Sequence, residues 1–198
     1  MDEKRFEKQL QFILELDKEK NILRQTHLSG HGRRENDAEH AWHMAAMIYL
    51  LREYANEEID LAKAMMMALI HDVVEIDAGD TYAYDEEGLA TQKEREEKAA
   101  DRIFGLLPED QRDDLRNLFE EFEDYATPEA RFARSMDNFQ PLLLNDSNDG
   151  GDWKTHDVCR AQIEKRHETT ERGSKEIAEY AMQLIDKHVK KGNIVEKK

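Results

Sequence analysis

The sequence predicts an all-α fold, a single-domain helical bundle, and three observations support this prediction. Only three prolines and nine glycines interrupt a chain of 198 residues. Residues that favour helices, such as Glu, Lys, Ala, Leu and Met, are abundant. Apolar residues recur at steps of three and four along most segments. We expect one domain over residues 1–198, with a core from about 5 to 190 and a frayed C-terminal tail.

The first helix is expected to end near residues 20–21. Its apolar residues form one stripe on an otherwise charged surface: Phe6, Leu10, Ile13 and Leu16. The following segment, 24–36, contains two glycines and a basic pair, and it lacks a helical period. We therefore expect an irregular connection there.

The second and third helices carry conspicuous histidines. Asn36 and Glu39 have the spacing of a capping box, so they are expected to begin the second helix and to place His40 in its first turn. The third helix is expected from about residue 59 to about 76, because Gly79 breaks the pattern that follows.

Caps and prolines mark the later helices. The pair Thr91 and Glu94 resembles a capping box, and Pro108 and Pro128 suit first helical turns. Residues 145–152 are polar and rich in Asp, Asn and Gly, so we expect a turn there. The later helices are expected to begin near residues 91, 108, 127, 155 and 174.

Charge and cysteine content exclude several classes of function. The formal net charge is −16, which disfavours a nucleic-acid or anionic-membrane surface, because phosphate groups would be repelled. No apolar run approaches the roughly 18 residues of a membrane span. The single cysteine, Cys159, excludes an internal disulfide and is best interpreted as a small buried residue. We expect a cytoplasmic protein that binds neither nucleic acid nor membrane.

An adjacent histidine and aspartate follow the most apolar run of the chain. Residues 65–70 read MMMALI, and any fold must bury them, which carries His71 and Asp72 to the edge of the core. Burying an imidazole and a carboxylate is costly unless both have partners. A metal ion satisfies both side chains at once, since each presents a lone pair to the same cation.

His40 and Asp137 complete a candidate set of ligands from three predicted helices. Two imidazoles and two carboxylates suit a divalent ion such as Mn²⁺, Co²⁺, Fe²⁺, Ni²⁺ or Mg²⁺. Four protein ligands leave octahedral positions open for water and substrate, as hydrolysis requires. Taken singly, either residue is interpreted more simply as a capping or surface residue.

Three motifs, in order, resemble a known family. The order His40, His71–Asp72 and Asp137 resembles the H…HD…D signature of the HD-domain metal-dependent phosphohydrolases, an all-helical superfamily. Residues 33–40, RRENDAEH, are similar to the R-x-E-N-x-x-E-H segment of the bacterial 5'-deoxynucleotidases. Residues 71–80, HDVVEIDAGD, are similar to their H-D-x-x-E-x-x-x-G-D element. The resemblance covers most of the chain and implies an HD-type helical bundle.

The resemblance implies a role for each matching residue. The implied metal ligands are His40, His71, Asp72 and Asp137; the implied catalytic acids are Glu75 and Asp80; the implied phosphate ligands are Arg33 and Arg24. Glu75 lies one helical turn after His71 and suits a general base, although it is equally placed to orient His71. Arg33 suits a phosphate, although an ion pair with Glu39 is the alternative.

The sequence departs from the deoxynucleotidase pattern at one place. Those enzymes carry an Arg-Trp pair ahead of the R-x-E-N segment, whereas Gln25 follows Arg24 here, so deoxyribose preference does not carry over. His43 and Asp77 match no assigned position. No histidine lies between Asp72 and Asp137, and the binuclear members of the superfamily need histidines there. One metal ion is therefore expected.

The expected function is a metal-dependent phosphomonoesterase acting on nucleoside 5'-monophosphates with a metal-bound water. Two alternatives stay open, namely a nucleotide phosphodiesterase or pyrophosphohydrolase, and a non-catalytic regulator that binds metal or nucleotide on the same scaffold. The expected partner is a small phosphorylated substrate. The resemblance also implies a homodimer.

Overall fold

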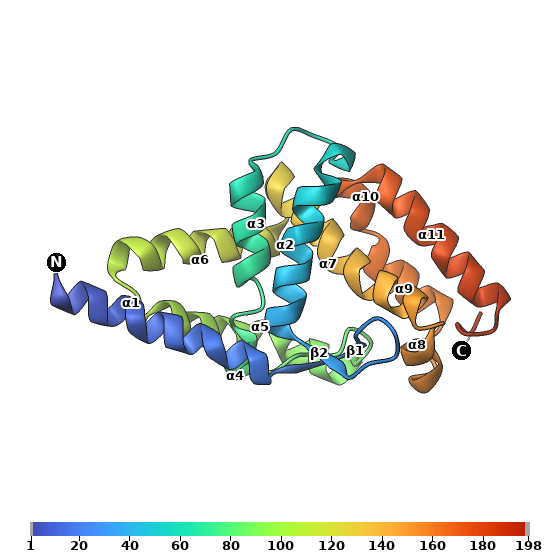
Figure 1. Cartoon of the computed structure of the whole chain (residues 1–198), viewed down its shortest axis with the longest axis horizontal. Helices are drawn as coiled ribbons and strands as arrows, with labels where there is room; N and C mark the ends of the chain where they lie inside the picture. Colours follow the sequence, from blue (N-terminus) through green and yellow to red (C-terminus); the bar gives the residue numbers. More distant parts are fainter. Residues whose placement is uncertain (1, 197–198) are drawn as a thin grey trace.

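The structure, a computed structural model, describes residues 2–196 and is mainly helical (Figure 1), which confirms the all-α prediction. The helices are α1 (Glu3–Leu16), η1 (Asp17–Asn21), α2 (Asp37–Leu51), η2 (Arg52–Tyr54), α3 (Leu61–Ile70), α4 (Glu75–Ala78), α5 (Glu86–Phe104), α6 (Glu109–Asp124), α7 (Pro128–Ser147), α8 (Gly151–Thr155), α9 (Arg160–His167), α10 (Thr170–Gly173) and α11 (Lys175–Lys190). Within the described residues the sheet is one antiparallel pair, β1 (Leu23–His27) and β2 (Arg34–Asn36).

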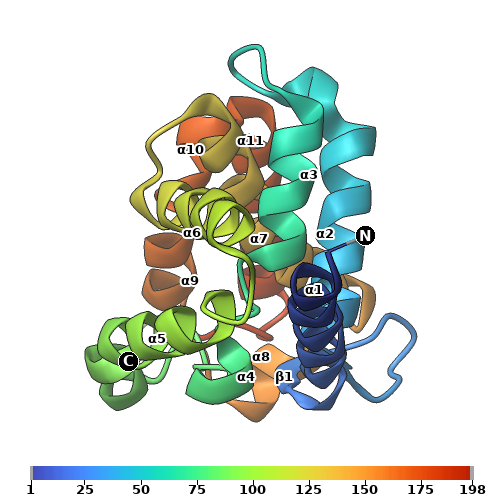
Figure 2. The same cartoon turned by 90° about the vertical axis from the view of Figure 1, so that its left-hand side faces the viewer.

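Helix α7 forms the centre of the molecule. Figures 1 and 2 show it surrounded by α2, α3, α6, α10 and α11, and all five pack against it. Its start is the predicted one, since the Thr127 side chain accepts a hydrogen bond from the Ala130 N–H (3.3 Å) and Pro128 occupies the first turn. Because α7 is covered along most of its length, its polar residues at 137 and 140 are buried and need internal partners.

Two apolar clusters share the interior, and α3 ends between them. The larger cluster surrounds α7 and includes Met67 and Ala68 of α3. The smaller cluster joins α1, α5 and α6 and includes Phe104 and Ile70, the last residue of α3. His71 therefore lies where the chain passes from one cluster to the other, and its ring centroid is 4.9 Å from that of Phe122.

The segment predicted to be an irregular connection forms the β1–β2 hairpin instead. The strands pair Leu23 with Asn36, and the Leu28 N–H donates to the Arg33 carbonyl oxygen at 2.9 Å. Gly30 has a φ of +79°, a conformation that favours glycine in this turn. The two strands are short and polar, so they lack the alternation of apolar residues by which a strand is predicted.

Two predicted helix boundaries are wrong. Helix α3 ends at Ile70 rather than near residue 76, and a turn of residues 71–74 separates it from α4. This turn buries Val73 and Val74 in the smaller cluster. Helix α5 begins at Glu86 rather than at Thr91, because the Asp85 side chain caps it by accepting a bond from the Gly88 N–H (3.2 Å).

The C-terminal part differs in detail from the prediction. Helix α7 continues to Ser147 and α8 begins at Gly151, so both enter the expected turn, and the helix expected from residue 155 begins only at Arg160, as α9. The Ser174 cap of the last helix is confirmed by its bond from the Ile177 N–H (3.2 Å). The expected frayed tail is packed where it is described: Ile194 is buried, and Val195 pairs with Cys159. Residues 197–198 lie outside the described residues.

No helix within residues 2–196 is long and apolar enough to cross a membrane.

The contact of α10 with α7 gives a test of the packing. A Cβ atom on Gly173 would overlap the Arg131 carbonyl oxygen and the Ser135 hydroxyl, and a backbone oxygen in a buried helix cannot move aside. Gly173→Ala should lower the free energy of unfolding by about 3 kcal/mol, measured by urea denaturation. The control Gly151→Ala meets no atom within 4 Å and should change stability by less than about 0.5 kcal/mol. Equal urea midpoints for the two variants would contradict the close contact of Gly173 with α7.

Candidate metal centre

Helices α2 and α7 and the turn after α3 present the predicted metal ligands to one buried point. His40 lies in the first turn of α2, whose start is fixed by two reciprocal bonds. The Glu39 N–H donates to Asn36 Oδ1 (2.9 Å), and the Asn36 N–H donates to Glu39 Oε2 (3.1 Å). His71 follows the last residue of α3, and Asp137 lies midway along α7.

The four predicted ligands lie within reach of a single ion. His40 Nε2 is 3.2 Å from Asp137 Oδ1 and 3.9 Å from Asp72 Oδ2. His71 Nε2 is 3.1 Å from Asp72 Oδ1 and 3.8 Å from Asp137 Oδ1. One ligand atom from each of His40, His71 and Asp72 lies within 4.8 Å of the other two. The structure therefore brings together residues that are up to 97 positions apart.

Hydrogen bonds on the far side of each imidazole fix the nitrogen that faces the centre. Gln140 Oε1 lies 3.1 Å from His40 Nδ1, and the Ala68 carbonyl oxygen lies 2.9 Å from His71 Nδ1, so each Nδ1–H donates outward. Gln140 is itself held by Glu35, whose Oε1 accepts from its amide at 2.6 Å. His71 Nε2 is buried and faces the carboxylates of Asp72 and Asp137 at 3.1 and 3.8 Å, without a well-directed hydrogen bond to any residue in the range 2–196. A buried nitrogen without a partner, facing carboxylates, fits a metal ligand.

Burial and neighbouring charges shift the pKa values of His40 and His71 in opposite directions. Burial, together with the charge of Arg24, lowers the pKa of His40 to about 4. Burial also lowers the pKa of His71, but the carboxylates of Asp72 and Asp137 outweigh it and raise that pKa to about 10. Without a metal ion, the centre therefore holds a proton on His71 at neutral pH.

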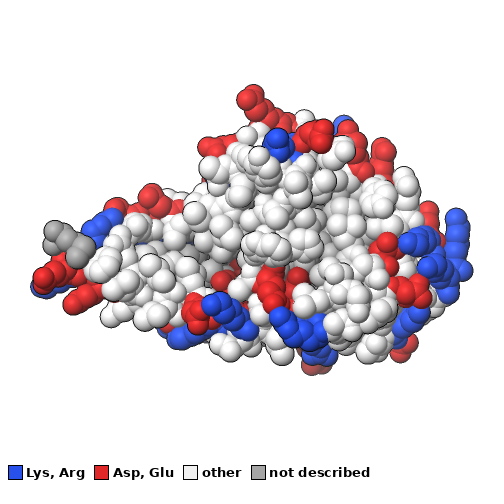
Figure 3. Space-filling model, viewed as in Figure 1, with Lys and Arg blue, Asp and Glu red and all other residues white. Residues whose placement is uncertain are grey.

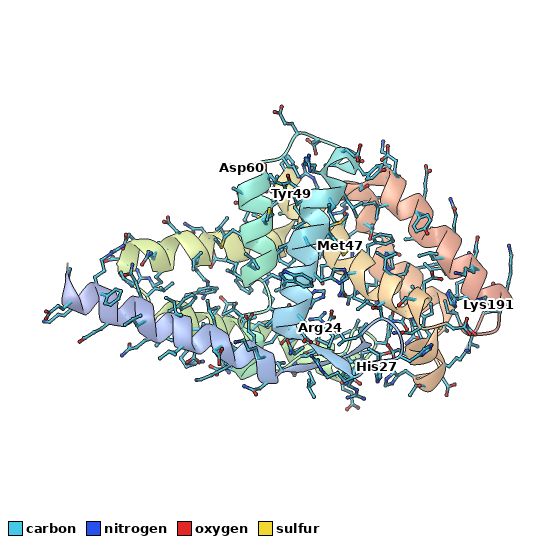
Figure 4. All side chains as sticks on the ribbon, viewed as in Figure 1. Arg24, His27, Met47, Tyr49, Asp60 and Lys191 are labelled. Carbon is cyan, nitrogen blue, oxygen red and sulfur yellow. The ribbon has the colours of Figure 1, made fainter. Side chains whose placement is uncertain are left out.

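A second group of carboxylates adjoins the first. Asp37, Asp72 and Glu75 place one oxygen each within 4.8 Å of the others. Burial, and then the charges of Asp72 and Asp37, raise the pKa of Glu75 well above its usual range. Arg24 of β1 donates to Asp72 Oδ2 (2.6 Å) and Asp37 Oδ1 (3.4 Å), and Figure 4 shows it near the start of α2. The guanidinium of Arg24 supplies a positive charge that offsets the repulsion among these buried carboxylates.

Asp80, the other predicted catalytic acid, lines a small cavity. Burial raises the pKa of Asp80, while the charge of Arg24 opposes the rise. The loop that carries Asp80 is held by Arg95 of α5, which donates to Thr81 Oγ1 at 2.7 Å. The cavity measures about 70 Å³, and its walls include Arg24, Asp80, Tyr82, Tyr84, Asn138 and Arg166. Glu75 and Asp80 thus lie near the centre, and their catalytic roles stay predictions.

A wider groove adjoins the centre through Arg134. This residue donates to Asp137 Oδ2 (3.2 Å) and to Glu123 Oε1 (2.7 Å). The groove lies between α5 and α6 and measures about 560 Å³, which is a usual size for a site that binds a small molecule. Arg166 lines both the groove and the small cavity.

Arg33 and Asp77, two further charged residues within the family motif segments, lie in ion pairs at the surface. Arg33 is exposed and binds Glu39, with Nη1 2.8 Å from Oε2, and it lines neither the described cavity nor the groove. This pair is the alternative that the sequence left open, so phosphate binding by Arg33 stays a prediction. Asp77 binds Arg102 of α5 at 2.8 Å.

Sequence reasoning missed Gln140, Arg134 and Arg166. The first two lie three residues from Asp137 on α7, and that helical spacing was a signal of their closeness. Gln140 also contacts His43, whose Nδ1 is 3.1 Å from its amide nitrogen. Arg166 lies on another helix and had no signal in the sequence, because no pattern of spacing links it to Asp137.

Comparisons with known proteins agree with this geometry. The family model described as HD domain matches residues 16–178. The crystal structure of a predicted metal-dependent phosphohydrolase from Magnetospirillum magnetotacticum is 49% identical and covers 98% of this chain and 97% of that chain, with a TM-score of 0.93. An HD-domain phosphohydrolase from Listeria innocua covers 92% of this chain and 85% of that chain at 21% identity, with a TM-score of 0.59, which shows the fold alone.

Curated relatives match over a shorter stretch. Human 5'-deoxynucleotidase HDDC2 is 32% identical over 111 residues, which is 56% of this chain and 53% of the human protein. The mouse protein of the same name is 32% identical over 109 residues. The chain therefore spans about half the length of the curated relatives it matches.

Metal binding should be coupled to loss of a proton. With a pKa of about 10, His71 is protonated at pH 7 in the metal-free protein, and an ion must displace that proton. We expect about one proton released for each Mn²⁺ bound, and an affinity that rises about ten-fold per pH unit up to the pKa. Calorimetry in buffers of different ionisation enthalpy measures the number of protons. His43→Gln keeps the four ligands and should release the same number, whereas pH-independent binding would contradict the assignment.

Proposed function

Because this chain belongs to the HD domain family, we propose that it is a metal-dependent phosphohydrolase that removes phosphate from nucleoside 5'-monophosphates, acting as a single domain over residues 1–198. The observation that carries the proposal is His71 Nε2, which is buried and faces the carboxylates of Asp72 and Asp137 without a well-directed hydrogen bond to any residue in the range 2–196. The 5'-deoxynucleotidase activity named for the human relative supports a nucleotide as the substrate.

We propose one divalent ion, held by His40, His71, Asp72 and Asp137. Imidazole and carboxylate ligands suit Mn²⁺, Co²⁺, Fe²⁺, Ni²⁺ or Mg²⁺. Arg24 already supplies a positive charge to the neighbouring carboxylates, which supports one ion rather than two. When bound, such an ion supplies a nucleophile from water at neutral pH and polarises the phosphoryl group.

The acids beside the metal ligands suit the two proton transfers of the reaction. Glu75 lies beside Asp72 and Asp37, and its raised pKa makes it, once ionised, a stronger base than an ordinary carboxylate toward an attacking water. Asp80 lies on the wall of the cavity with Arg24 and Arg166, and its raised pKa suits the delivery of a proton to the leaving oxygen. The guanidinium of Arg24 holds Asp72 in place by its bond of 2.6 Å. The chain thus offers separate groups for ligation and for proton transfer.

We also propose a homodimer that forms through an apolar face on α2 and α3. Trp42, Tyr49, Leu50, Met66 and Leu69 are exposed by 41 to 69% and define this face. Figure 3 shows the surface over α2 and α3 with few charged side chains. A chain of net charge −16 repels a second copy elsewhere, so a surface of low charge is the one where two copies approach.

A cytoplasmic location is the last part of the proposal. It is supported by Cys159, the single cysteine, which is buried and unpaired, as is usual in a reducing compartment. Recovery of the protein only in a secreted fraction would contradict it.

Phosphate release should distinguish the proposed activity from its alternatives. After chelation and reloading with Mn²⁺ or Co²⁺, the protein should release phosphate from nucleoside 5'-monophosphates. Cleavage of cyclic nucleotides or diphosphates alone would indicate a phosphodiesterase or pyrophosphohydrolase. Tight metal binding without any release would indicate a binding regulator.

Two variants of the same assay separate ligation from proton transfer. His71→Ala should lose the metal ion, whereas Glu75→Gln should keep it and lose about 100-fold or more in kcat. The control Glu94→Gln removes an exposed glutamate that pairs with Lys98, and it should behave as the parent protein. Loss of metal from Glu75→Gln would show that Glu75 holds the site together instead.

Light scattering tests the dimer. The parent protein should have twice the mass of one chain, and Leu50→Glu should have the mass of one chain, because a charge in the centre of the apolar face is costly to bury. Tyr180→Glu places the same charge on α11, where Tyr180 is 48% exposed, and should leave the dimer intact. A monomeric parent protein, or a dimeric Leu50→Glu variant, would refute this interface.

A further inference from the structure

We propose that Arg166 binds the phosphate group of the substrate and directs its nucleoside into the groove between α5 and α6; this inference rests on the function proposed above. Arg166 lies on α9 and lines both the small cavity and the groove. Its Nη2 is 3.8 Å from Asp137 Oδ1, the oxygen that lies 3.2 Å from His40 Nε2. A guanidinium therefore stands at the edge of the proposed metal centre.

Arg166 differs from the other arginines near the centre because its donors are unused. Arg24 is 10% exposed and contacts three carboxylates. Arg33 is paired with a glutamate of its own segment. Arg134 binds two carboxylates and stacks on an aromatic ring, 4.1 Å from the centroid of Phe122. The side chain of Arg166 is 27% exposed, and apart from its ion pair with Asp137 at 3.8 Å it makes no hydrogen bond with any residue in the range 2–196.

The balance of charge at the proposed metal centre requires a further positive group to bind a phosphate. A phosphate monoester carries close to two negative charges at neutral pH. The two charges of one divalent ion would be matched by Asp72 and Asp137, and Arg24, which contacts Asp72 at 2.6 Å and Asp37 at 3.4 Å, is matched by the same group of carboxylates. An incoming phosphate would otherwise meet these carboxylates and Asp80, which costs free energy by like-charge repulsion. Arg166 supplies the cation that remains available.

The chemistry of arginine suits this position. The planar guanidinium can donate two parallel hydrogen bonds to two phosphate oxygens, which fixes orientation as well as charge. As the phosphorus is attacked, negative charge increases on those oxygens, and a donor already in place stabilises it. Arg166 would then contribute to substrate binding and to the rate.

Size decides where the nucleoside lies. The small cavity, at about 70 Å³, has room for about two water molecules and cannot hold a nucleotide. The groove, at about 560 Å³, falls in the range of sites that bind molecules of nucleotide size. Leu89 and Phe119 give the groove apolar surface against which a base can pack. Because Arg166 lines both spaces, a phosphate held there leaves the nucleoside facing the groove.

The test measures phosphate binding apart from turnover. Inorganic phosphate is titrated into Mn²⁺-loaded protein by calorimetry, and the metal content and melting temperature of each variant are recorded. Arg166→Ala should weaken phosphate binding about ten-fold or more, with metal content and melting temperature unchanged. Arg166→Lys keeps the charge but loses the planar pair of donors, so its affinity for phosphate should fall between those of the parent protein and Arg166→Ala. The control Lys165→Ala changes an exposed residue next to Arg166 and should bind phosphate as the parent does.

Each other outcome has a definite meaning. Unchanged phosphate affinity in Arg166→Ala, or no phosphate binding by the parent protein, overturns the inference. Loss of the metal from Arg166→Ala also overturns it, because Arg166 would then serve to neutralise Asp137. Weakened phosphate binding in a protein that hydrolyses no nucleoside monophosphate would support Arg166 and refute the proposed substrate instead.

Discussion

The interaction on which the rest of the structure depends is the neutralisation of buried carboxylates beside two imidazoles. Asp37, Glu75 and Asp137 are buried, and Asp72 lies between them. An ionised carboxylate that loses water without gaining a partner costs several kcal/mol, so such a group is stable only with cations next to it. Arg24 supplies one positive charge, and the groups around His71 could hold a metal ion that would supply more. The acids, the arginine and the imidazoles therefore form one electrostatic unit.

The break in the helix at His71 follows from the same constraint. In a continuous helix, side chains at adjacent positions point about 100° apart, so His71 and Asp72 would not face the same centre. The turn of residues 71–74 removes this restriction and brings His71 Nε2 to 3.1 Å from Asp72 Oδ1. The turn also buries Val73 and Val74 in the smaller apolar cluster. This burial stabilises the turn against continuation of the α3 helix.

Much of the fold was predictable, because the signals were local or periodic, whereas the ligand set came from the family resemblance and stays a prediction. Apolar spacing predicted the helices, and caps such as the Asn36–Glu39 pair predicted several starts. The closeness of His40 to Asp137 followed from their places on the buried faces of two helices. The β1–β2 hairpin was missed, because its strands are polar on account of their contacts with the centre. Arg166 was missed because tertiary packing alone brings it to Asp137.

The position of Arg33 in the family motif implies phosphate binding, whereas its contact in the structure, an ion pair with Glu39, indicates a structural role. Glu39 accepts the Asn36 N–H at the start of α2 and also binds Arg33, so these residues together fix the helix turn that carries His40. A guanidinium already bound to a carboxylate must give up that bond before it can bind a phosphate, and the exchange cancels much of the gain. Arg166 makes an ion pair with Asp137 at 3.8 Å but no hydrogen bond within the described part of the chain, so its donors are free to turn to a phosphate. The availability of an arginine to an anionic substrate is thus set by its present partners, and motif position alone does not determine it.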